Sequence, residues 1–134
     1  MAVSDFTYIT FREHLGDNQD DLDTSFPFMG SKTSVKSFTI DGEPISGYVI
    51  VNTEDMDWHF HKILINDRNL PGLDLWNVSS GKRISRLSMD EVPEGFLRNG
   101  TNTIQIIRTH VEHEDVDDQD NFIIHDVVVH WKRR

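Results

Sequence analysis

The sequence has 134 residues, of which 37% are hydrophobic and 27% are charged, and its formal net charge is −10. This length and composition predict one folded domain over residues 1–134 and exclude a disordered chain. The acidic balance argues against nucleic acid as a partner, because neutralising phosphates requires a basic surface.

The chain contains no cysteine, which excludes a disulfide framework, a thiolate zinc site and a catalytic thiol. No basic segment followed by an apolar stretch opens the sequence, and no run of about 18 apolar residues occurs. We therefore expect a soluble, cytoplasmic protein with no membrane partner. Asp outnumbers Glu by 16 to 7, which fits either an ordinary acidic surface or adaptation to high salt.

Alternating polar and apolar residues dominate the sequence, and no stretch shows the periodicity of an amphipathic helix. An aromatic run predicts the first strand, and acidic loops follow it at 16–23 and precede the last strand at 112–120. One helical or 3₁₀ turn is expected at 90–95. The predicted strands, in chain order, are residues 6–12, 35–40, 48–51, 58–65, 73–76, 83–88, 103–109 and 122–131.

About eight short strands separated by turn signals are typical of a sandwich or barrel. A parallel α/β fold is disfavoured, because each of its crossovers needs a dozen or more residues, usually in a helix. The sequence therefore predicts an all-β protein, an antiparallel β-sandwich.

Three segments in the second half of the chain share motifs with a known class of domain. The motif residues are Asn66 and Asp67 after the strand at 62–65, Leu97, Gly100, Asn102, Ile104 and Ile106 within 95–106, and Asp126 in the last strand. These motifs resemble those of galactose-binding-like jelly-roll domains, in which a turn glycine stands at the position of Asp67. The resemblance implies jelly-roll topology, and the whole chain is similar to small single-domain jelly-roll proteins of archaea with acidic proteomes.

Aromatic side chains suggest the first ligand, because an aromatic ring stacks on the apolar face of a sugar while carboxylates and amides bind its hydroxyls. Trp76 lies in a turn-rich stretch beside Asp74, which favours its exposure. For each tryptophan, a place in the core is the favoured alternative. The predicted ligand-binding residues are Trp76, Asp74, Trp58, Tyr48 and His61.

A pair of histidines could begin a metal site. His59 and His61 share one face of the predicted strand at 58–65, as ligands of a cupin-type site would. Cupins carry a glutamate a few residues after the pair, whereas here the first glutamate after His61 is Glu91. The favoured alternative is that both histidines line a half-buried face with Ile63 and Ile65.

The second acidic loop could hold calcium through Asp115, Asp117 and Asp120, because calcium binds oxygen ligands spaced at alternate positions. An EF-hand requires glycine and glutamate where Asp120 and Asp126 stand. A solvated loop is therefore favoured, with a structural calcium ion as the alternative.

No nucleophile elbow, P-loop, dinucleotide fingerprint or zincin helix is present, so neither an enzyme activity nor an organic cofactor is predicted. The fold resemblance favours a non-catalytic binding module with carbohydrate as its first ligand class. A second hypothesis is a structural or protein-interaction domain that self-associates or docks on a protein partner. The third is a His-based metal-binding protein of cupin type.

Overall fold

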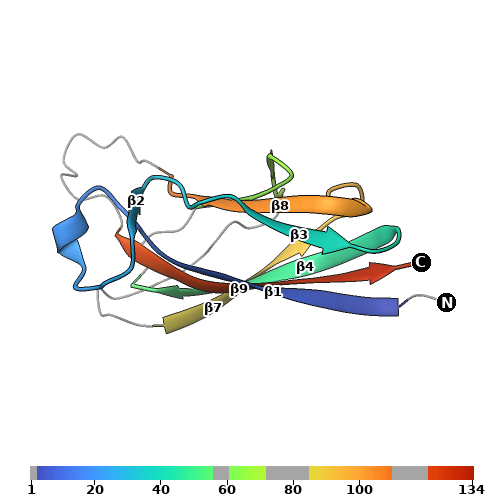
Figure 1. Cartoon of the computed structure of the whole chain (residues 1–134), viewed down its shortest axis with the longest axis horizontal. Helices are drawn as coiled ribbons and strands as arrows, with labels where there is room; N and C mark the ends of the chain where they lie inside the picture. The colour runs from blue at the N-terminus through green and yellow to red at the C-terminus, as the bar shows by residue number, and fades with distance from the viewer. Residues whose placement is uncertain (1–2, 56–60, 72–84, 110–120) are drawn as a thin grey trace.

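The computed structural model describes residues 3–55, 61–71, 85–109 and 121–134. These residues form nine strands and one 3₁₀ turn, η1 at Gln19–Asp21 (Figure 1). The strands are β1 (Val3–Leu15), β2 (Phe28–Gly30), β3 (Lys36–Ile40), β4 (Pro44–Glu54), β5 (Lys62–Ile65), β6 (Arg68–Asn69), β7 (Ser85–Val92), β8 (Gly100–Ile107) and β9 (Phe122–Arg133). The predicted strand at 73–76 lies outside the described residues.

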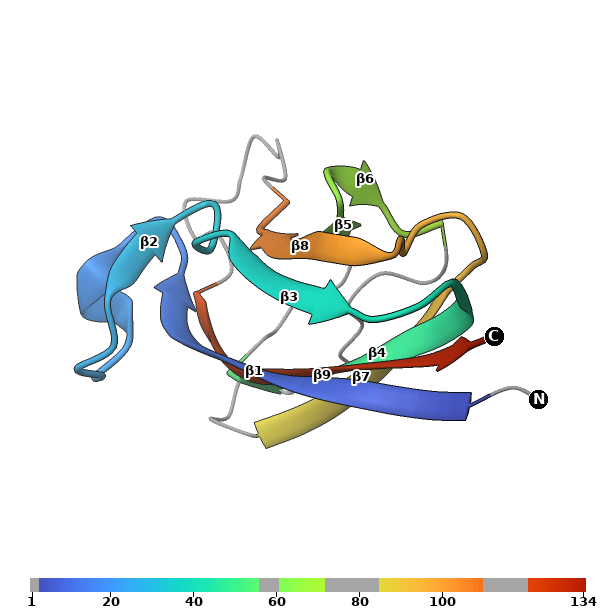
Figure 2. The same ribbon diagram turned by 45° about the vertical axis from the view of Figure 1, so that its right-hand side comes forward.

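The strands form two sheets that lie as separate layers (Figures 1 and 2). The five-stranded sheet has the order β2-β1-β9-β4-β7, and the four-stranded sheet has the order β3-β8-β5-β6. This confirms the predicted all-β sandwich. One pairing differs from the antiparallel prediction: β2 runs parallel to β1, so the five-stranded sheet is mixed.

Alternation along the strands builds the core. Inward residues of β1, β4 and β9 pack against inward residues of β3, β5 and β8, and Trp131 on β9 stacks on Phe38 with ring centroids 6.1 Å apart. Trp131 is 3% exposed, so it occupies the core position favoured for a tryptophan. The aliphatic residues of this cluster that are 0% exposed are Leu15, Val49, Val51, Ile63, Ile65, Val92, Ile104, Ile106, Ile124, Val127 and Val129.

The hairpin between β5 and β6 contains the turn that the sequence predicts. Asn66 and Asp67 both have positive φ, 52° and 64°, as a two-residue hairpin turn with matching twist requires. Asp67 therefore adopts the left-handed conformation at the place where the related domains have glycine.

Some local predictions differ from the structure. Residues 90–92 complete β7, so the turn predicted at 90–95 begins later: Glu94 and Gly95 form it, and the Phe96 amide donates a hydrogen bond to the carbonyl oxygen of Pro93. The sequence pattern also missed β2 and β6, which have only three and two residues. Strands this short show no alternation of their own and depend on the pairing partner that tertiary structure supplies.

Candidate functional site

Among the described residues, most of the large apolar side chains that are exposed to solvent lie on the outer face of the five-stranded sheet. We define the outer face as the outward-pointing side chains of β1, β9, β4 and β7. Strand register arranges them in three rows, which are Phe6-His130-Tyr48-Glu91, Tyr8-Val128-Ile50-Met89 and Thr10-Asp126-Asn52-Leu87. Each row therefore brings together residues that are far apart in the sequence.

Large apolar side chains on this face remain exposed to solvent. The exposed fractions are 64% for Phe6, 57% for Tyr8, 74% for Leu87 and 69% for Met89. Scattered single apolar residues on a protein surface are ordinary, but a contiguous apolar patch marks an interaction site. The outer face is therefore the candidate binding surface of the described residues.

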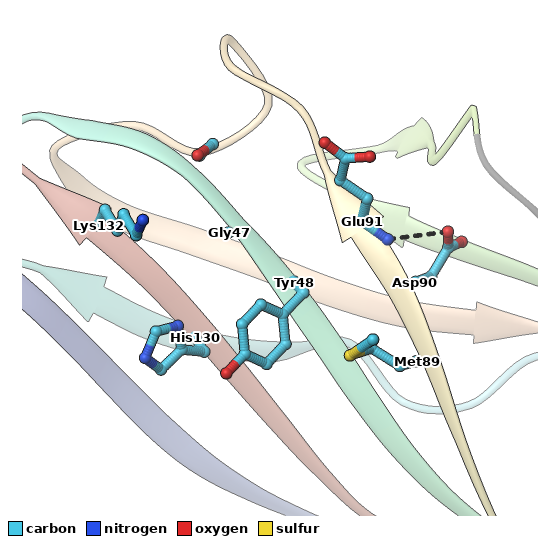
Figure 3. Close-up of a pocket in the computed structure, with 8 residues that line it drawn as sticks. Gly47, Tyr48, Met89, Asp90, Glu91, His130 and Lys132 are labelled. Atoms are coloured by element: carbon cyan, nitrogen blue, oxygen red, sulfur yellow. Dashed lines mark hydrogen bonds between the residues drawn. The ribbon is translucent and has the colours of Figure 1, made fainter.

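A groove of about 360 Å³ opens on the outer face between β9, β4 and β7 (Figure 3). Its centre is a stacked pair, Tyr48 and His130, with ring centroids 4.7 Å apart and ring planes 19° apart. Glu91 and Lys132 add a carboxylate and an ammonium group, and Ser46 a hydroxyl, to the lining. The groove thus joins an aromatic surface to polar groups that can donate and accept hydrogen bonds.

Gly47 lets the strands beneath the groove approach closely. A Cβ atom at Gly47 would overlap the backbone carbonyl oxygen of His130 and would lie 3.0 Å from the Cα atom of Trp131. Because Gly47 has no side chain, β4 and β9 can pair here. This pairing places Tyr48 beside His130.

A second, smaller hollow of about 140 Å³ lies on the same face, farther along β4. It is lined by Tyr8, Ile50, Asn52, Leu87, Asp126 and Val128. Hydrogen bonding to Asp126 raises the pKa of the Tyr8 phenol, and the positive charge of Arg12 opposes this shift. The Oδ1 atom of Asp126 is buried and has no hydrogen-bond partner within the described part of the chain.

The structure separates two of the predicted ligand residues. Tyr48 lies in the groove. His61 is fully buried, stacks on Phe122 with ring centroids 4.4 Å apart, and accepts a hydrogen bond from the Thr109 amide through Nδ1. His61 shares the inward side of its strand with Ile63 and Ile65, so it cannot contact a ligand on the outer face together with Tyr48.

The remaining predicted site residues, Trp58, Asp74, Trp76, Asp115, Asp117 and Asp120, lie outside the described residues, as does His59. Within residues 3–55, 61–71, 85–109 and 121–134, no three His, Asp or Glu side chains form a group that could hold a metal ion. The same residues include no helix long and apolar enough to cross a membrane.

Comparison with known proteins places the chain in a family. Residues 3–133 match the model of DUF7383, described as a family of unknown function. The chain belongs to this family. No curated protein matches this DUF7383 member.

Among solved structures, this DUF7383 protein is similar to a family 35 carbohydrate binding module from an environmental isolate. The two share 16% sequence identity over 90% of this chain and 86% of that chain, with a TM-score of 0.52. At this level of identity the likeness shows the fold alone, a jelly-roll β-sandwich, which agrees with the resemblance carried by the turn and strand motifs.

Sequence reasoning missed most of the outer face of this DUF7383 protein. Glu91, Lys132, Met89 and Leu87 lie on strands whose neighbours in the sheet are distant in the sequence. The available signal was the first strand, where Phe6 and Tyr8 alternate with Ile9 and Phe11, so that both sides of the strand are apolar. One side of such a strand packs on the core. The other side leaves an apolar surface exposed unless another layer packs against it.

Proposed function

We propose that this protein is a non-catalytic binding module and that the groove around Tyr48 and His130 binds carbohydrate. The observation that carries the proposal is the combination of this stacked aromatic pair with Glu91 and Lys132 in one groove. An aromatic surface contacts the apolar face of a sugar ring, and charged or hydroxyl groups at its edge bind the sugar hydroxyls.

The fold adds support of a weaker kind. The similar solved structure is a carbohydrate binding module, and the two chains are alike over most of their lengths. Because one fold supports many functions, the support for carbohydrate binding comes mainly from the groove and its residues.

Nuclear magnetic resonance titration tests the proposal directly. The isotope-labelled protein is titrated with glucose, galactose, mannose and xylose and with oligosaccharides of each. We expect at least one saccharide to shift the backbone resonances of residues 46–48, 89–91 and 130–132 in a saturable way. If every saccharide leaves these resonances unchanged at millimolar concentration, the proposal is wrong.

Two alanine substitutions localise the binding. Tyr48→Ala removes the stacked ring from the groove and is expected to weaken saccharide binding at least tenfold. Val35→Ala shortens a side chain that is 53% exposed and lies outside the outer face, and is expected to leave the affinity unchanged. Equal losses in the two variants would argue against the groove as the binding site.

A further inference from the structure

The outer face carries a second feature besides the groove. We define the apolar patch as Phe6, Tyr8, Leu87 and Met89, together with Ile50 and Val128 between them in the register of the sheet. Aromatic side chains have about 150–250 Å² of surface, and each of the four exposed members is more than half exposed, so together they present on the order of 500 Å² to solvent. A contiguous apolar patch of that size is at the upper end of what monomeric proteins leave uncovered.

The charge on this face contrasts with that of the whole chain. The chain carries a formal net charge of −10. The acidic groups in the three rows are Glu91 and Asp126, and basic groups lie close to both ends of the face: Lys132 in the groove and Arg12 near Tyr8. The three rows therefore hold only two of the 23 acidic residues of the chain, so most of the charge that repels two copies of this protein lies on other surfaces.

We propose that two copies of this chain associate through their outer faces, apolar patch against apolar patch. Stable interfaces bury about 800 Å² per partner, of which about 56–65% is non-polar. The apolar patch supplies an area of that order. Two sheets can pack face to face with interdigitating side chains, and a two-fold axis places the same patch on both sides of the contact.

Sedimentation of the unmodified protein tests this association without any saccharide, so the result does not depend on the proposed carbohydrate binding. We expect the mass to rise from monomer to dimer as the protein concentration increases from micromolar to millimolar. Added sodium chloride is expected to strengthen the dimer, because salt screens the repulsion between two copies of charge −10. A monomer at every protein and salt concentration would overturn the proposal.

Matched substitutions to lysine locate the interface. Leu87→Lys places a charge in the apolar patch while reducing the net negative charge of the chain, so general repulsion cannot explain a weaker dimer. We expect it to raise the dimer dissociation constant at least tenfold. Val35→Lys changes a residue that is 53% exposed and lies outside the outer face, and is expected to leave dimerisation unchanged.

Circular dichroism and thermal unfolding of both variants check that the fold is retained. Should Leu87→Lys unfold the protein, Phe6→Lys provides an independent change in the patch, on another strand. Equal dimerisation of the wild type, Leu87→Lys and Phe6→Lys would place the contact elsewhere and contradict the proposal, as would an equal loss in Val35→Lys.

Discussion

The side chain of Asn66 donates a hydrogen bond from Nδ2 to Oδ1 of Asn102, at 2.9 Å, and so ties the β5-β6 turn to the start of β8. Asn102 is completely buried. Its Oδ1 atom also accepts from the Arg98 amide, and its Nδ2 group donates to the carbonyl oxygens of Arg98 and Gly100. One side chain therefore satisfies three backbone groups of Arg98 and Gly100.

We expect Asn102→Ala to lower the free energy of unfolding by about 2–3 kcal/mol, because it leaves several buried polar groups without partners. Urea unfolding followed by circular dichroism measures the change. Asn69→Ala, at an exposed position of β6, is the control and is expected to alter stability by less than about 0.5 kcal/mol. Similar losses in the two variants would show that the Asn102 network is not the source of stability.

The close approach of β4 and β9 at Gly47 leads to a second prediction. Gly47→Ala forces a methyl group into the backbone of His130, so we expect a loss of about 1–3 kcal/mol in unfolding free energy. Ser46→Ala changes the neighbouring residue without that overlap and is expected to be nearly neutral. Thermal denaturation of both variants gives the comparison, and a neutral Gly47→Ala would mean that the two strands can separate here without cost.

Titration of the tyrosines tests the second hollow. The chain has two tyrosines, so a Tyr48→Phe background isolates the tyrosinate absorbance of Tyr8. Hydrogen bonding to Asp126 raises the pKa of Tyr8, and Asp126→Asn is expected to lower it. Glu91→Gln, on a strand away from Tyr8, is the control. An unchanged titration curve in Asp126→Asn would contradict this assignment.

The same shift has a consequence for stability. The folded-state pKa of Tyr8 lies above its unfolded value of about 10, so the folded state holds the phenolic proton more tightly. The resulting stabilisation is fully present below the unfolded pKa and is lost as the pH rises through the folded pKa. Unfolding of the Tyr48→Phe protein at increasing alkaline pH should show this loss, and Asp126→Asn should reduce it.

A buried carboxylate anchors the segment before β3. Glu13 is 6% exposed and accepts two hydrogen bonds from Ser34, one from the amide at 2.8 Å and one from the hydroxyl at 2.6 Å. We expect Glu13→Ala to cost about 2 kcal/mol and Ser34→Ala less, because the amide bond to Glu13 survives in Ser34→Ala. In a double-mutant cycle the two changes should couple by about 1 kcal/mol. Additive effects would show that the hydroxyl contact contributes nothing.

The sequence by itself determined the all-β class, most of the strands and the Asn66-Asp67 turn, because alternation and turn residues act over a few neighbouring positions. It also placed His61 on the same side as Ile63 and Ile65. It did not show that this side faces the core. Alternation distinguishes the two sides of a strand, but it does not tell which side packs against a second layer.

Only the tertiary structure decided that Ile9 and Phe11 are buried while Phe6 and Tyr8 face outward on the same strand. The groove depends in the same way on pairing between β4, β7 and β9, which brings Tyr48 beside both His130 and Glu91. Such register is set by packing among strands that are distant in the sequence, so no local pattern contains it. The local sequence therefore determined the elements, whereas the packing of one sheet face against the second sheet decided which side chains are buried and which face solvent.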